Sequence, residues 1–159
     1  HARHHHCVWD ERTRCWFTGD TFGLSYREFD TAEGPWIMPT STPVQFEPEP
    51  LKASIARLLE RDPAGICLTH FGRVGGAARL GALLVEQIDT MVAMAREVKP
   101  GPDRHAALRQ GLRAQYDDQL RRLGFSDRAP LLQLLALDVE LNAQGLGIWL
   151  DRPTRDTKA

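Results

Sequence analysis

The fold of this chain depends on a short stretch that reads RCWFTGD at residues 14–20. Its aromatic and β-branched residues predict a strand, which ends at Gly19 and Asp20. A similar run lies at residues 5–9, and a polar tetrapeptide at residues 10–13 separates the two. The two runs therefore predict a β-hairpin with an acidic side chain directly after its second strand.

Residues 21–45, which follow this hairpin, contain two glycines and three prolines, and this composition predicts a long loop. Loops of this length are uncommon in compact domains and often have a function. A helix is predicted from the prolines at 48–50 to the Asp-Pro pair at 62–63. The apolar residues on one face of this helix are Leu51, Ile55, Leu58 and Leu59. A short apolar strand is predicted at residues 65–69, and His70 follows it.

Beyond residue 76 the apolar residues recur at three and four positions, which predicts helices only. The three predicted helices are expected to end at Lys99-Pro100-Gly101-Pro102, at Gly124 and near Gly145. We therefore expect a sheet-containing part over residues 1–75, a helical C-terminal subdomain over residues 76–152, and a flexible tail over residues 153–159.

Composition excludes several classes of partner. The 159 residues are 42% apolar and 26% charged, with a net charge of −1. This balance gives no basis for a nucleic-acid partner or for an anionic membrane surface. The three cysteines form no close pair, which favours reduced thiols in a cytoplasmic protein over a disulfide framework.

Polar residues at the ends of the predicted strands are candidates for chemistry. His1 precedes the first strand, Asp20 follows the second, and His70 follows the third. Active-site groups often collect where rigid strands end in exposed loops. Imidazole and carboxylate together suit zinc, iron or manganese. The alternative is turn chemistry, in which Asp20 bonds only to nearby backbone amides.

The sequence around these residues resembles the later motifs of the metallo-β-lactamase superfamily. The matching words are HARHHHC at residues 1–7, TGDT at residues 18–21 and LTHFG at residues 68–72, in the family's order. The resemblance covers about residues 1–75. It implies an α/β fold, namely the C-terminal half of an αββα metallo-β-lactamase sandwich, followed by a helical C-terminal region.

The resemblance also implies roles for individual residues. His1, Asp20 and His70 would be metal ligands, and Asp20 would be the catalytic carboxylate that bridges two divalent ions. Zinc is the expected metal, with iron and manganese as alternatives. His5 and Thr69 would contact the metal ligands and hold them in their orientation.

The activity implied is metal-dependent hydrolysis of a small-molecule substrate, as in glyoxalase II-like enzymes, where a metal-bound hydroxide attacks a thioester. The family's His-x-His-x-Asp-His motif is not found, and the chain opens without methionine. We therefore expect the chain to be incomplete and inactive alone. Without the upstream half, apolar sheet surface should be exposed, which predicts self-association or covering of that surface by the C-terminal helices.

The loop after Asp20 offers two candidate substrate-binding residues, Tyr26 and Arg27, because guanidinium matches an anionic group well. The alternative is that Arg27 is solvated and Tyr26 packs on the loop. Two other functions stay open. One is a noncatalytic helical interaction module that retains a relic of the metal site. The other is a nuclease or RNA-processing member of the same superfamily, against which the near-neutral charge counts.

Overall fold

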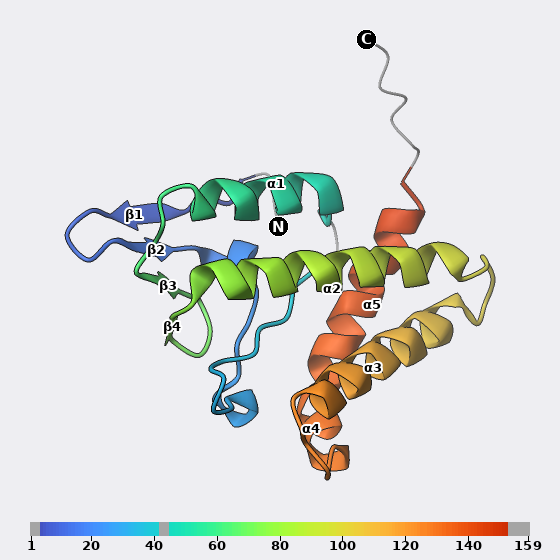
Figure 1. Ribbon diagram of the computed structural model, residues 1–159. Coiled ribbons are helices and arrows are strands. Elements are labelled where there is room, and N and C mark those ends of the chain that lie inside the picture. The colour runs from blue at the N-terminus through green and yellow to red at the C-terminus, as the bar shows by residue number, and fades with distance from the viewer. Residues whose placement is uncertain (1–3, 42–44, 153–159) are drawn as a thin grey trace.

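The computed structural model describes residues 4–41 and 45–152, and within these ranges the fold is mixed α/β (Figure 1). It has a four-stranded sheet and, in the same ranges, five α-helices. The strands are β1 (Val8–Asp10), β2 (Cys15–Phe17), β3 (Gly65–Cys67) and β4 (Arg73–Val74). The helices are α1 (Pro48–Leu59), α2 (Ala77–Glu97), α3 (Arg104–Arg122), α4 (Ala129–Leu134) and α5 (Ala136–Leu150).

The sheet has the strand order β1-β2-β3-β4. Strands β1 and β2 pair antiparallel, which confirms the predicted hairpin. Strand β3 then pairs parallel with β2, with Phe17 opposite Cys67. Strand β4 pairs antiparallel with β3 and was not predicted, because its two residues are too few to form a pattern.

The two faces of the sheet differ in burial. Ile66 and Val74 are fully buried, and the indole Nε1 of Trp16 donates a hydrogen bond to the carbonyl oxygen of Leu58 in α1 at 2.9 Å. Val8 and Phe17 lie opposite each other and are 54% and 52% exposed. The described helices thus leave these two side chains uncovered.

Residues 19–41 form a mostly buried connection between the sheet and the helices. The segment contains the 3-10 turns η1 (Gly19–Phe22) and η2 (Arg27–Phe29). Trp36 is fully buried, with its ring centroid 5.1 Å from that of Phe29 and 6.1 Å from that of Tyr116 in α3. Trp36 therefore packs against α3. A single apolar core therefore joins the two predicted parts of the chain.

The helical region differs from the prediction at its C-terminal end. Gly124 ends α3 as predicted, with a left-handed φ of 86° and a hydrogen bond from Phe125 N to Leu120 O of 3.1 Å. The third predicted helix is divided into α4 and α5. Its expected end near Gly145 is wrong, because α5 continues to Leu150. A Cβ at Gly145 would lie 2.8 Å from Ser41 O, so glycine there permits close packing.

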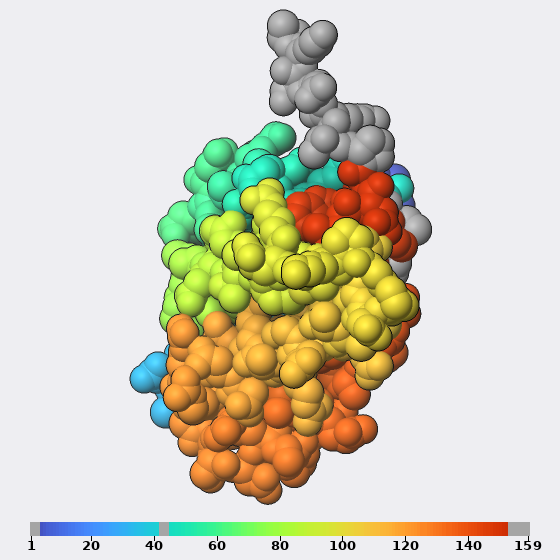
Figure 2. Space-filling view, turned by 90° about the vertical axis from the view of Figure 1, so that its right-hand side faces the viewer, coloured from blue at the N-terminus to red at the C-terminus, as the bar shows by residue number. Residues whose placement is uncertain are grey.

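Helices form the side of the molecule that lies opposite the sheet. Figure 2 shows this side, where α3 and α4 make up most of the surface and the end of α5 lies above them. Among the described residues, no helix combines the length and the apolar character that crossing a membrane requires.

Candidate functional site

Asp20 and His70, which were predicted from strand ends, lie side by side. Phe17 of β2 and Cys67 of β3 are paired, and Asp20 and His70 each lie three residues after their member of this pair. Because β2 and β3 are parallel, the two segments leave the sheet at the same end. Asp20 Oδ1 and His70 Nε2 are 3.9 Å apart. The structure thus brings together two of the three predicted ligands, and His1 lies outside the described residues.

The turn that carries Asp20 is supported by His5. Gly19 has a left-handed φ of 52°, and a Cβ there would lie 1.9 Å from His5 Nε2. A side chain at this position would therefore be strained by the left-handed backbone and would displace the His5 imidazole. His5 Nε2 donates to the carbonyl oxygen of Thr18 at 3.1 Å, which requires the tautomer protonated at Nε2. This contact places His5 behind the backbone of the Asp20 turn.

His70 lies in the tight turn between β3 and β4. A hydrogen bond from Leu68 N to Gly72 O of 3.1 Å closes this turn. Phe71 and Gly72 have φ angles of 69° and 89°, both in the left-handed region. Such a conformation is uncommon for a bulky residue such as Phe71. Thr69, which was predicted to orient a ligand, is exposed in this turn.

Tyr26 connects this turn to the helical region. Its ring lies over that of Phe71, with centroids 4.1 Å apart and an interplanar angle of 30°. Its hydroxyl donates to Asp138 Oδ2 at 2.9 Å, across 112 residues of sequence. Asp138 belongs to α5 and was not predicted as a site residue. The available signal was the presence of two acidic residues, Asp138 and Glu140, within the leucine-rich run of residues 131–141.

The electrostatics of this contact follow from burial. Burial raises the pKa of the Asp138 carboxyl above its ordinary value, while the hydrogen bond from the Tyr26 hydroxyl acts in the opposite direction. The pKa of the Tyr26 phenol is also raised, first by burial and then by its hydrogen bond to Asp138. Tyr26 is therefore a neutral donor near neutral pH, as a hydrogen bond to a carboxylate requires.

Arg27 is engaged within its own segment. Its Nη2 donates to the carbonyl oxygen of Ser25 at 2.7 Å and also contacts the Ser25 hydroxyl. Its Nη1 forms an ion pair with Asp30 Oδ2 at 3.4 Å. A substrate anion would have to compete with Asp30 for this guanidinium, so substrate binding by Arg27 stays a prediction.

Asp20 and His70 supply the types of donor atom that zinc binds, a carboxylate oxygen and an imidazole nitrogen. In a tetrahedral zinc site two such atoms lie roughly 3.4 Å apart. The observed 3.9 Å between Asp20 Oδ1 and His70 Nε2 is wider than this, so both side chains would have to move to bind one ion. Two donors are fewer than a catalytic zinc normally has. Within residues 4–41 and 45–152, no group of three or more His, Cys, Asp or Glu side chains is placed to hold a metal.

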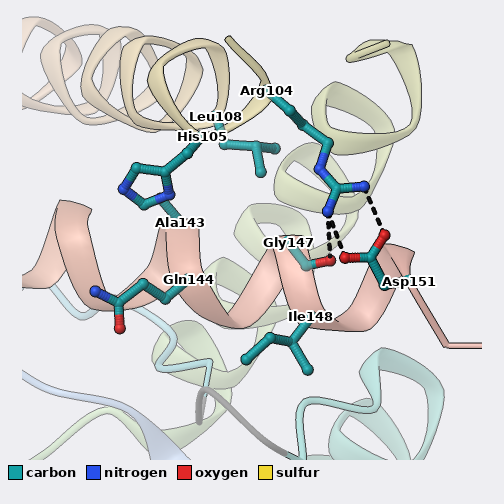
Figure 3. Close-up of a pocket in the computed structure, with 8 residues that line it drawn as sticks. All are labelled: Arg104, His105, Leu108, Ala143, Gln144, Gly147, Ile148 and Asp151. Carbon is teal, nitrogen blue, oxygen red and sulfur yellow. Dashed lines mark hydrogen bonds and ion pairs between the residues drawn. The ribbon is translucent and has the colours of Figure 1, made fainter. Parts of the chain in front are cut away.

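A separate hollow of about 250 Å³ lies between α3 and α5 (Figure 3). Its lining residues are Arg104, His105, Leu108, Ala143, Gln144, Gly147, Ile148 and Asp151. Arg104 Nη1 donates to Asp151 Oδ1 at 2.7 Å, and His105 Nε2 lies 3.0 Å from Glu140 Oε1. Acidic side chains therefore already contact both Arg104 and His105. The hollow also lies toward the end of α5 opposite to Asp138, so it is not part of the Asp20–His70 site.

Comparison with known proteins adds no relative to this picture. The chain matches no family model, and neither a curated protein sequence nor a solved structure is significantly similar to it.

Proposed function

We propose that this chain is part of a metal-dependent hydrolase of the metallo-β-lactamase superfamily that acts on a thioester, as glyoxalase II-like enzymes do. The observation that carries the proposal is the distance of 3.9 Å between Asp20 Oδ1 and His70 Nε2. These residues are 50 positions apart, and each lies in one of the motifs that carry the resemblance. A functional pair explains why a carboxylate and an imidazole meet at a common sheet edge.

The arrangement of the sheet supports the finer assignment of the fold. In one half of an αββα sandwich, helices cover one face of the sheet, and a second sheet packs on the other face. Here α1 is bonded to one face through Trp16, whereas Val8 and Phe17 on the other face are about half exposed. This asymmetry fits one half of an αββα sandwich.

The proposed site assigns separate tasks to the residues present. Asp20 would supply carboxylate oxygens that can bridge two ions, and His70 would supply a neutral imidazole nitrogen. His5 holds the Asp20 turn through Thr18 O. Bound divalent ions would supply Lewis acidity and an activated water for hydrolysis. The resemblance assigns a further ligand to His1, and a complete site requires more ligands than Asp20 and His70 provide.

Zinc binding by the chain tests this proposal directly. We expect isothermal titration with Zn²⁺ at pH 7 to detect binding by the unmodified chain. Asp20→Ala and His70→Ala should each weaken binding by about tenfold or more, because each removes one of few donors. His1→Ala should also weaken it.

The helical region offers a matched control. His105 and Glu140 form another imidazole–carboxylate pair, with 3.0 Å between Nε2 and Oε1. His105→Ala should leave the zinc affinity unchanged. Equal affinities for the unmodified chain, Asp20→Ala, His70→Ala and His105→Ala would contradict a metal centre at Asp20 and His70.

One observation favours the alternative of a helical interaction module. Leu137, Leu141 and Ile148 of α5 are 67%, 41% and 40% exposed, and their spacing places them along one side of the helix. If this surface is the functional feature, Leu137→Ser combined with Leu141→Ser should abolish self-association in sedimentation experiments. In that case zinc should bind no better to the unmodified chain than to Asp20→Ala.

A further inference from the structure

We propose that Asp138 of α5 is a positioning residue of the Asp20–His70 site and acts on His70 through Tyr26 and Phe71. The helical region would then complete the site instead of only following it in sequence. The role of Asp138 in positioning a metal ligand rests on the proposed metal-dependent function. The contacts of Asp138, Tyr26 and Phe71 do not depend on that function.

The first support is the burial of Asp138. Within the described ranges, Asp138 is the one formally charged side chain among the buried residues, with 8% exposure. A buried carboxylate is unfavourable unless hydrogen bonds or charges compensate for it. The position in the first turn of α5 favours an acidic residue, because the helix dipole is positive there. That effect requires neither burial nor a tyrosine partner, so it does not explain the contact with Tyr26.

The second support is the direction of the hydrogen bond. The Tyr26 hydroxyl donates to Asp138 Oδ2 at 2.9 Å, which fixes the far end of the Tyr26 side chain. The same ring also forms a T-shaped contact with Phe29, with centroids 5.8 Å apart and an interplanar angle of 73°. Tyr26 is therefore held both by α5 and by the buried segment that contains Phe29.

The third support is the contact between Tyr26 and the His70 turn. Phe71 is 46% exposed and has a left-handed φ of 69°, so its own conformation is unfavourable. Its ring lies 4.1 Å from that of Tyr26, centroid to centroid. Phe71 follows His70 directly, so a ring that restrains Phe71 also restrains the His70 backbone. A series of contacts therefore leads from Asp138 through Tyr26 and Phe71 to His70, whose imidazole lies beside Asp20.

Hydroxyl deletions give a matched pair of variants. Tyr26→Phe removes the donor to Asp138 but keeps the ring. Ser41→Ala removes a different hydroxyl that ties the same segment to α5, since Ser41 Oγ lies 3.0 Å from Asn142 Oδ1. Asp138→Ala removes the acceptor, and Asp138→Asn keeps an acceptor oxygen without the charge.

Two measurements separate a positioning role from a general loss of stability. In the metal-free chain, nuclear Overhauser contacts between the rings at positions 26 and 71, together with the ¹³C–¹H shifts of the His70 ring, report the geometry. We expect Tyr26→Phe and Asp138→Ala to weaken these contacts and move the His70 signals, and to weaken Zn²⁺ binding by about tenfold. Ser41→Ala should change neither, and Asp138→Asn should restore most of both.

The outcomes distinguish the inference from the proposed function. If the unmodified chain binds no Zn²⁺, the proposed function fails, while the resonance measurements still test the positioning contacts. If Zn²⁺ binds normally and Tyr26→Phe and Asp138→Ala behave like Ser41→Ala in both measurements, the positioning role is overturned and the metal site stands.

Discussion

Asn142 of α5 binds the end of the buried connection at Ser41. Asn142 Oδ1 accepts a hydrogen bond from Ser41 N at 2.7 Å, and its Nδ2 donates to Pro39 O at 3.2 Å and to Tyr116 Oη at 2.8 Å. Asn142 is 3% exposed, so water cannot easily replace these bonds. This one side chain connects α5, α3 and the segment that leads back to the sheet.

Replacement of Asn142 by alanine should strongly destabilise the chain. The change leaves Ser41 N and Pro39 O buried without their partner, and each such group costs about 1–3 kcal/mol. We expect the free energy of unfolding in urea to fall by roughly 3 kcal/mol. The control is Gln144→Ala. Gln144 is exposed on α5, so this change should alter the free energy of unfolding little. Equal values for the two variants would contradict the connecting role of Asn142.

Two glycines of α5 should respond to alanine in opposite directions. A Cβ at Gly145 would lie 2.4 Å from Ser41 Oγ and 2.8 Å from Ser41 O, whereas a Cβ at Gly147 would meet Leu108 Cδ1 at 3.8 Å. Alanine gains about 1 kcal/mol over glycine in a helix, but overpacking costs about 1–3 kcal/mol. Thermal unfolding should therefore show Gly147→Ala to be more stable and Gly145→Ala less stable than the unmodified chain. Stabilisation by both substitutions would show that α5 does not pack closely on Ser41.

The stability of the chain should depend on pH through Asp138. Its folded pKa is raised by burial, so between the unfolded value of about 3.9 and the folded value the native state binds more protons than the unfolded state. The contribution of Asp138 is thus present below the unfolded pKa and is lost as pH rises through the folded pKa. Asp138→Asn should become progressively more stable relative to the unmodified chain as pH rises from about 4, as measured by urea unfolding.

Glu140 provides a control of opposite sign on the same helix. The hydrogen bond from Gln144 lowers the pKa of Glu140, with further contributions from His105 and Arg109. Its stabilising contribution is present above the unfolded pKa and is lost as pH falls through the folded pKa. Glu140→Gln should therefore lose stability relative to the unmodified chain as pH rises. The same pH trend in both variants would contradict the burial effect at Asp138.

The thiol of Cys15 should titrate below its ordinary range because of Arg73. Arg73 Nε donates to Cys15 Sγ at 3.5 Å, and this contact lowers the pKa of Cys15. In a chain that also carries Cys7→Ser and Cys67→Ser, Arg73→Gln should raise the pKa seen in thiolate absorbance near 240 nm. Arg14→Gln is the control, since Arg14 pairs with Asp62. An unchanged Cys15 pKa in Arg73→Gln would refute the effect of the guanidinium.

The sequence by itself determined the local elements and the type of donor at the strand ends. Aromatic and β-branched runs with a polar turn between them predicted the hairpin of β1 and β2, and apolar spacing predicted α1, α2 and α3. The position of Asp20 and His70 after predicted strands marked them as candidates. These features are readable because they depend on neighbours within about ten residues, where periodicity and capping act.

The tertiary structure alone decided which of these features meet. No local pattern indicates that β3 pairs parallel with β2, yet that pairing places His70 beside Asp20. The burial of Asp138 against Tyr26 and the interior position of Gly145 likewise depend on where α5 packs. Such contacts form because segments far apart in the sequence bury their apolar side chains in one common core. The free energy of that packing depends on the whole chain and not on any local stretch of it.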